Sequence, residues 1–253
     1  MRRIFMGIVV LCAFFFIGTC IDDGSSYSTV TVSSSLSGEY DMSALNSDDK
    51  EVLKANIMVF NDQYSSFLGI TYKENNSYGS GVIYKSDAKF YYALTNNHVV
   101  NLDYAYKHQD LYIEDYYANK IAAEVVYSDV KYDLAVIRFA KTSKLNELEI
   151  SDDAITVREN VKSLGNPHSI RNVVSKGQVN CYSYVTLDTN KSKVDFEVIV
   201  HSAKIAGGSS GGALLNSDNE IIGITFAGVF DNTGNFITGY AIPAMRIKEF
   251  LNK

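Results

Sequence analysis

The sequence predicts an all-β fold of the barrel type. Short apolar runs recur between residues 66 and 242, separated by polar or glycine-containing turns, and such near-regular spacing is typical of β-barrels. The 18 tyrosines and 13 phenylalanines favour strands, because aromatic side chains pack well on a pleated surface. After a targeting segment is subtracted, about 200 residues remain, enough for one folded region with a sizeable core.

Two sets of predicted strands flank a polar linker at residues 141–153. The first set comprises 66–72, 81–85, 90–95, 111–113, 121–127 and 135–139. The second set comprises 161–164, 173–179, 194–201, 213–215, 221–226 and 239–242. A capping sequence at 47–51 predicts a helix that runs to about residue 60. Residues 244–251 predict a C-terminal helix that packs on the second set of strands.

Residues 1–20 have the pattern of a secretory signal, which predicts an exported protein. Arg2 and Arg3 precede an apolar run from residue 4 to 17, which is short for a membrane-spanning helix. Cys20 stands where a bacterial lipobox carries its lipidated cysteine, although Thr19 replaces the usual Gly, Ala or Ser. Three outcomes stay open for this segment. Cys20 is lipidated and holds the protein on the outer face of the cell membrane, the signal is cleaved and the protein is secreted, or the uncleaved segment is retained as the anchor. Residues 21–46, rich in Ser, Thr, Gly and Asp, indicate a flexible tether.

The charge and cysteine content narrow the remaining classes of function. The formal net charge is −6, with no basic cluster beyond the first three residues, so we do not expect a nucleic-acid partner. Cys181 is the only cysteine of the predicted folded region, so no disulfide can form within it. The histidines other than His98 are His108, His168 and His201. They lack the spacing of metal ligands, so we expect no metal or cofactor.

Three polar residues stand beside predicted strands in a chemically suggestive order. His98 follows the 90–95 strand, Asp133 precedes the 135–139 strand, and Ser210 lies within GGSSGG at 207–212. Each alone has a structural explanation, since histidines are often partly buried and aspartate and glycine are common in turns. Together, His–Asp–Ser is the chain order of the chymotrypsin-type triad. Glycines around a serine also let successive amides turn toward one point, as stabilisation of an oxyanion requires.

These motifs resemble those of trypsin-like serine peptidases. Residues 95–100 read TNNHVV, 132–136 read YDLAV and 208–212 read GSSGG. Four further segments resemble the bacterial HtrA/Deg branch: GSGVI at 79–83, SLGNP at 163–167, VSKGQV at 174–179 and YAIP at 240–243. The resemblance covers roughly residues 64–250. It implies a chymotrypsin-like double barrel of six antiparallel strands each, at about 64–145 and 154–245, within a protease domain at 47–253 whose C-terminal helix spans about 244–252.

The resemblance also implies a role for each residue of the motifs. His98 would be the general base, Asp133 would orient its imidazole, and Ser210 would be the nucleophile that forms a covalent acyl-enzyme. Backbone groups at Gly208, Ser209 and Ser210 would form the oxyanion hole. The implied activity is that of an exported serine endopeptidase acting on polypeptides, with envelope protein quality control as one setting. Ser209 replaces the aspartate of digestive trypsins, so we expect activity without N-terminal maturation.

The walls of the implied substrate pocket are Lys204, Ile205, Thr225, Phe226, Ala227 and Gly239. Lys204 stands where trypsins carry an acidic floor, so we expect small or medium aliphatic side chains rather than Lys or Arg before the cleaved bond. Recruitment of an acidic side chain by Lys204 is the alternative. Thr225 is either a hydrogen-bond donor to Asp133 or an ordinary strand residue.

Two rival functions stay open on the sequence. One is a catalytically inactive peptide-binding or adhesive module on the same fold, and the other is a secreted protease similar to glutamyl endopeptidases. Relatives of the HtrA type form trimers, but residues 46–60 do not settle the oligomeric state. The sequence stops at Lys253, so we do not expect a PDZ module.

Overall fold

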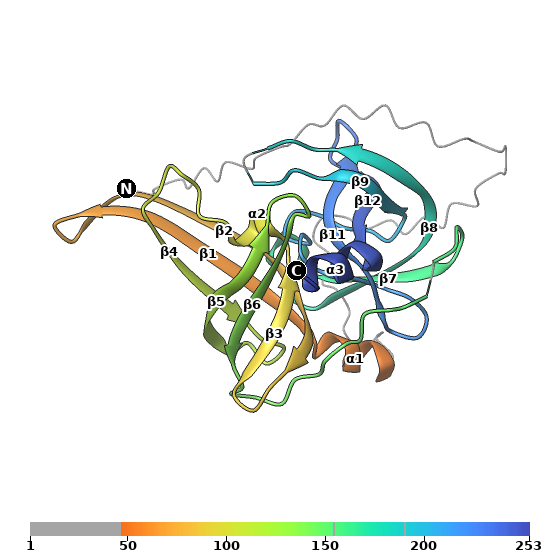
Figure 1. Ribbon diagram of the computed structural model, residues 1–253, viewed down its shortest axis with the longest axis horizontal. Coiled ribbons are helices and arrows are strands. Elements are labelled where there is room, and N and C mark those ends of the chain that lie inside the picture. Colours follow the sequence, from red (N-terminus) through yellow and green to blue (C-terminus); the bar gives the residue numbers. More distant parts are fainter. Residues whose placement is uncertain (1–46, 154, 190) are drawn as a thin grey trace.

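Two closed β-barrels make up the computed structural model of the chain (Figure 1). The structure describes residues 47–153, 155–189 and 191–253. Strands β1 to β6 close the first barrel and β7 to β12 close the second. The prediction of an all-β double barrel with a helix at each end is confirmed. The predicted signal and tether, residues 1–46, lie outside the described residues.

The first barrel is built from antiparallel pairs in the order β1-β2-β3-β6-β5-β4. Its strands are β1 (Asn56–Phe67), β2 (Ile70–Ser86), β3 (Phe90–Thr95), β4 (His108–Glu114), β5 (Lys120–Asp129) and β6 (Leu134–Ala140). Buried and part-exposed residues alternate along most of β1, as expected for a strand with one face on the core. The short helix α2 (Asn97–Val100) follows β3.

Two predictions at the start of this barrel are wrong. Helix α1 (Ser47–Leu53) ends before residue 60, because residues 56–67 pair with both β2 and β4 as strand β1. The predicted strand at 66–72 is instead the tip of the β1–β2 hairpin. Leu68 and Gly69 form its two-residue turn with φ of 50° and 78°, the left-handed geometry that suits a tight hairpin.

The second barrel has the strand order β10-β11-β12-β9-β8-β7, again antiparallel. Its elements are β7 (Asn160–Gly165), the 3-10 turn η2 (Pro167–Ser169), β8 (Val173–Thr186), β9 (Asp195–His201), β10 (Ala213–Leu215), β11 (Ile221–Phe230) and β12 (Phe236–Pro243). Helix α3 (Ala244–Leu251) has the predicted bounds and packs against β11 and β12. Cys181 lies in β8.

Helix α3 also joins the two barrels. The ring of Phe250 is fully buried and stacks on Tyr127 of β5, with 4.8 Å between the ring centroids. Lys253 Nζ lies 2.7 Å from Asp129 Oδ2, at the end of β5. The end of the chain thus ties the second barrel to the first, and the largest apolar cluster contains residues of both barrels.

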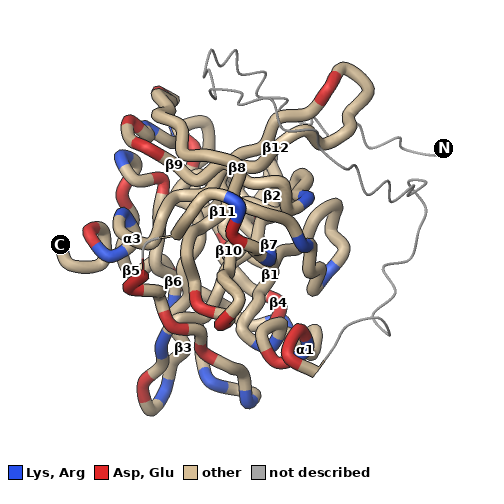
Figure 2. Tube along the Cα trace, turned by 90° about the vertical axis from the view of Figure 1, so that its right-hand side faces the viewer, with Lys and Arg blue, Asp and Glu red and all other residues tan. Residues whose placement is uncertain are grey.

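Charged residues are interspersed over both barrels in the view of Figure 2. Within the described part of the chain, none of the helices has the length and apolar character that crossing a membrane would need.

Candidate active site

His98 and Asp133 are brought together by the strand order of the first barrel. Strand β3 ends at Thr95, and α2 begins at Asn97, so His98 lies in the first turn of a short helix. Strands β3 and β6 are neighbours, and Asp133 directly precedes β6. The backbone of Asp133 has φ 51°, the left-handed region that Asp adopts more readily than most residues.

The carboxylate of Asp133 holds both the ring and the backbone of His98. Asp133 Oδ2 lies 2.7 Å from His98 Nδ1, and Asp133 Oδ1 accepts the His98 amide at 2.9 Å. Asn96 Nδ2 donates to the Asp133 carbonyl at 2.9 Å. Asp133 is fully buried, whereas 29% of the His98 side chain is exposed. This arrangement keeps a proton on Nδ1 and leaves Nε2 as the acceptor.

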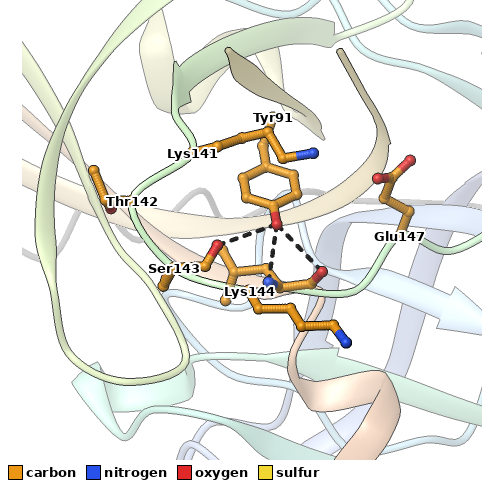
Figure 3. Close-up of a pocket in the computed structure, with 7 residues that line it drawn as sticks. Tyr91, Lys141, Thr142, Ser143, Lys144 and Glu147 are labelled. Carbon is orange, nitrogen blue, oxygen red and sulfur yellow. Dashed lines mark hydrogen bonds between the residues drawn. The ribbon is translucent and has the colours of Figure 1, made fainter. Parts of the chain in front are cut away.

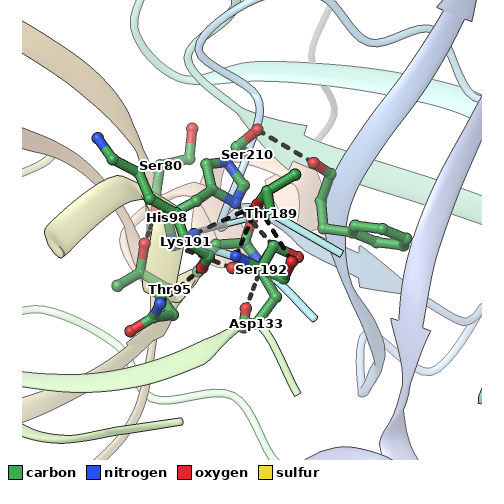
Figure 4. A network of polar contacts seen from close by, with 11 residues as sticks. Ser80, Thr95, His98, Asp133, Thr189, Lys191, Ser192 and Ser210 are labelled. Carbon is green, nitrogen blue, oxygen red and sulfur yellow. Dashed lines mark hydrogen bonds and ion pairs between the residues drawn. The ribbon is translucent and has the colours of Figure 1, made fainter. Parts of the chain in front are cut away.

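Ser210 lies in the loop between β9 and β10, on the second barrel. Figure 4 shows its side chain close to the His98 ring, with Asp133 on the other side of that ring. The Ser210 hydroxyl donates to the carbonyl of Phe226 at 3.5 Å. Within the residues that the structure describes, it makes no hydrogen bond to His98. The structure therefore collects His98, Asp133 and Ser210 in one place, with the hydroxyl turned toward β11.

In the loop around Ser210, three amides, those of Gly207, Gly208 and Ser210, have no acceptor among the described residues. The Ser209 amide donates to the Ala206 carbonyl at 2.9 Å, and the His168 amide donates to the Gly207 carbonyl at 2.8 Å. Among the described residues, the amides of Gly208 and Ser210 donate to no protein group. Of the three residues predicted for the oxyanion hole, Ser209 therefore uses its amide to close the turn instead.

The predicted pocket residues range from exposed to buried, with Ala227 half-buried and Gly239 buried. Lys204 is exposed, whereas Ile205, Thr225 and Phe226 are buried. The Ile205 side chain lies against Gly228, where an added Cβ would come within 3.0 Å of it. The Thr225 hydroxyl has no hydrogen-bond partner in the described part of the structure, so the predicted bond from Thr225 to Asp133 is absent there.

His201 is a buried residue at this pocket that the sequence did not reveal. It ends β9 opposite Gly239 of β12, and its side chain is fully buried. A Cβ added at Gly239 would lie 2.4 Å from the His201 ring, so only glycine fits beside that ring. Burial lowers the pKa of His201 to about 4, because a charged imidazole is poorly solvated there. His201 is the last residue of the strand predicted at 194–201, and its neighbours Val200 and Ser202 gave no signal that its ring would be buried.

A turn of the second barrel covers the His98 side of the site. Asn97 Nδ2 donates to the carbonyl of Lys191 at 2.6 Å, and Lys191 Nζ lies 3.3 Å from Asp103 Oδ2. Figure 4 shows Thr189, Lys191 and Ser192 next to His98 and Asp133. The β8–β9 connection thus fixes the second barrel against the segment that carries His98.

An open hollow of about 500 Å³ lies elsewhere, on the linker after β6 (Figure 3). It is lined by Tyr91, Lys141, Thr142, Ser143, Lys144, Leu145 and Glu147. The Tyr91 hydroxyl donates to the Ser143 carbonyl at 3.1 Å and accepts the Leu145 amide at 3.0 Å. These bonds hold the linker on the first barrel and do not involve the triad residues.

Two β-barrels with a His–Asp pair on one and a glycine-flanked serine on the other define the chymotrypsin class of fold. The family model described as a trypsin-like peptidase domain matches residues 79–224, more than half of the chain. The chain therefore belongs to the trypsin-like peptidase family, as its motifs predicted.

The curated relatives place it near the HtrA/Deg branch. It is 34% identical over 176 residues to the periplasmic serine endoprotease DegP of Salmonella typhimurium, covering 69% of this chain and 35% of that protein. It is 33% identical over 167 residues to the periplasmic pH-dependent serine endoprotease DegQ of Escherichia coli, covering 66% and 34%. It is 31% identical over 174 residues to the serine protease Do-like HtrA of Bacillus subtilis, covering 67% and 37%. The chain spans about a third of the length of these relatives.

Proposed function

We propose that this protein is an exported serine endopeptidase that hydrolyses peptide bonds in polypeptides. The observation that carries the proposal is the buried Asp133 carboxylate, 2.7 Å from His98 Nδ1 and on the far side of the ring from Ser210 (Figure 4). A buried carboxylate that holds an imidazole beside a serine hydroxyl is the arrangement that activates a serine nucleophile.

In this mechanism the Ser210 hydroxyl rotates about χ1 from the Phe226 carbonyl to His98 Nε2. His98 takes the hydroxyl proton as Ser210 Oγ attacks the substrate carbonyl, and Asp133 stabilises the imidazolium that forms. The C–N bond then breaks, His98 protonates the leaving amine, and an acyl-enzyme remains on Ser210. Water, deprotonated by His98, releases the acid product and restores the serine.

The amides of Gly208 and Ser210 are the donors for the developing oxyanion. Preorganised amides of this kind contribute roughly 3–4 kcal/mol each in comparable enzymes. The Ser209 hydroxyl accepts the Ala206 amide at 3.1 Å, so the turn is closed by its own residues. This supports activity without a maturation cleavage, because no partner for a new N-terminus is required at position 209.

For the substrate, we infer a preference for small or medium aliphatic side chains before the cleaved bond. Ile205 is buried and lies against Gly228, so this wall of the substrate pocket is apolar and the pocket is shallow there. Lys204 is exposed, which weakens the alternative of an acidic side chain bound by its ammonium. A cleavage profile on a peptide library decides between them. The proposal expects aliphatic residues before the cleaved bond, whereas the alternative expects acidic residues there and loss of that preference in Lys204→Ala.

The activity itself is tested by labelling with a fluorophosphonate probe. Wild type should form a covalent adduct at Ser210, and Ser210→Ala should not. Ser217→Ala serves as the matched control, since Ser217 is an exposed serine after β10. Equal absence of label in wild type and Ser210→Ala, together with peptide binding by both, would favour the inactive binding module.

For the location, we propose export with attachment to the outer face of the cell membrane through Cys20. The names of the relatives DegP and DegQ describe periplasmic proteases, which supports export. Cys20 follows the apolar run of residues 4–17 at the position of the lipidated cysteine of a bacterial lipobox, which supports the anchor.

Wild type should incorporate labelled palmitate, and Cys20→Ser should not. A mature chain whose intact mass shows no added lipid would contradict the lipid anchor.

A further inference from the structure

Ser80 of β2 connects the first barrel to the loop that carries Ser210. Its hydroxyl donates to the Gly208 carbonyl at 2.7 Å. The same oxygen accepts the Asn166 amide at 2.9 Å and Asn166 Nδ2 at 3.0 Å. The Ser80 amide donates to the Ser210 carbonyl at 2.7 Å, and Ser80 is fully buried.

These bonds fix the direction of the Ser80 hydroxyl proton. A hydroxyl has one donor hydrogen and two acceptor lone pairs. The two N–H groups of Asn166 occupy the lone pairs, so the hydrogen is left for the Gly208 carbonyl. The side chain is therefore fully hydrogen-bonded without water, which makes it a rigid support.

The hydroxyl of Ser80 thereby orients the peptide between Gly208 and Ser209. Because a trans peptide is planar, its N–H points opposite to its C=O. Holding the Gly208 carbonyl on Ser80 turns the Ser209 amide toward the Ala206 carbonyl, 2.9 Å away. The amides on either side, those of Gly208 and Ser210, donate to no protein group among the described residues.

The glycines around Ser80 and Ser210 are explained by the same contact. A Cβ added at Gly79 would come within 2.9 Å of the Ser210 carbonyl oxygen, and one at Gly211 within 2.1 Å of the Ser80 carbonyl oxygen. That Ser80 carbonyl also accepts the Thr95 hydroxyl at 2.7 Å, just ahead of the helix that carries His98 (Figure 4). Ser80 thus touches both the nucleophile loop and the His98 segment.

We propose that Ser80 is a positioning residue of the oxyanion hole, supplied to the second barrel by the first. The proposal rests on the proposed peptidase function. Ser80 touches neither the substrate nor the reacting atoms, and acts by keeping the Gly208 and Ser210 amides directed at one point. Its effect should fall on the transition state, where charge develops on the oxyanion, more than on substrate binding.

The test compares Ser80→Ala with wild type and with the matched control Ser77→Ala. Ser77 lies on the same strand, and its hydroxyl donates to the Asn61 carbonyl at 3.3 Å, away from the loop. Ser80→Ala should lower kcat about 10- to 100-fold with KM within about twofold, since it disturbs donors whose outright removal costs more. Affinity for a peptide boronate, which mimics the transition state, should fall in step with kcat. Ser80→Cys, a weak donor of similar size, should give an intermediate loss.

A second measurement does not depend on activity. Amide hydrogen exchange of the segment around Ser209 should speed up about tenfold or more in Ser80→Ala and stay unchanged in Ser77→Ala, because the turn loses its outside support. If Ser80→Ala does not fold, the same exchange measurement compares Ser80→Cys with wild type.

The outcomes separate this proposal from the peptidase assignment. Wild-type kcat and wild-type exchange in Ser80→Ala would overturn the role of Ser80 and leave the assignment intact. Equal losses in kcat and in binding of an unreactive peptide would also overturn it, in favour of a general structural role. Absence of label in wild type would remove the assignment, while the exchange measurement would still decide whether Ser80 holds the loop.

Discussion

His98 Nδ1 and Asp133 Oδ2 lie 2.7 Å apart although 35 residues separate them in the chain. The same carboxylate also accepts the His98 backbone amide at 2.9 Å. Ring and backbone of His98 are therefore held by one buried group, so a small change at Asp133 alters both the ring tautomer and the position of α2. The first prediction follows from this double contact.

Asp133→Asn should lower kcat by about 10³- to 10⁴-fold with little change in KM, because an amide cannot accept from both the His98 ring and its amide while stabilising the imidazolium. Steady-state kinetics on a peptide substrate measures this. Asp110→Asn, an exposed carboxylate on β4, should leave kcat unchanged. Activity of Asp133→Asn within tenfold of wild type would contradict the role given to Asp133.

Gly211→Ala should destabilise the fold and abolish labelling of Ser210. Gly211 has φ 88°, and its added Cβ would lie 2.1 Å from the Ser80 carbonyl oxygen, so we expect a loss of about 3 kcal/mol or more from strain and overlap together. Gly234→Ala is the matched control, because Gly234 has φ 85° with open space around it. It should cost about 1 kcal/mol, the conformational part alone. Equal unfolding free energies from urea titration of the two variants would show that the overlap is relieved.

Phe250→Ala should lower the free energy of unfolding by about 3–5 kcal/mol. The ring is fully buried and stacks on Tyr127 of the other barrel, so its removal leaves a cavity where the two barrels are tied together. Met245→Ala on the same helix removes a side chain that is 61% exposed and should change stability by less than about 0.5 kcal/mol. Thermal and urea unfolding of both variants check the difference, and a similar small effect in both would argue against α3 as a tie.

The stability of the protein should fall as the pH is lowered from about 6.5 to about 4, in part through His201. Burial lowers the pKa of His201 to about 4 in the folded state, whereas the unfolded chain takes up the proton near pH 6.5. The unfolded state thus binds more protons in this window, so acid favours unfolding. The full effect of this one group is about 3 kcal/mol.

Urea titrations between pH 4 and 8 measure that dependence. His201→Leu should flatten it, while His108→Gln, at an exposed histidine on β4, should not. An unchanged pH dependence in His201→Leu would mean that the ring is accessible to water in the folded state.

The sequence by itself determined the all-β class, most strand positions along the chain and the positions of the three motifs. Alternating apolar positions and turn residues gave most strands of both barrels, and the C-terminal helix was predicted with its exact bounds of 244–251. These features depend on neighbouring residues, whose spacing sets which face is buried. The predicted helix to residue 60 and strand at 66–72 were wrong for the converse reason: long-range pairing of β1 with β2 and β4 decided both.

Only the tertiary structure decided which groups meet at the site. It placed Ser80 under the Gly208 carbonyl, turned the Ser209 amide away from the substrate side and buried His201 against Gly239. The contacts Ser80–Gly208 and His201–Gly239 have no local signature, because each joins residues that are distant in the chain. A chain encodes its faces and turns locally, whereas the partner of a buried polar group is set only when distant strands close into a barrel.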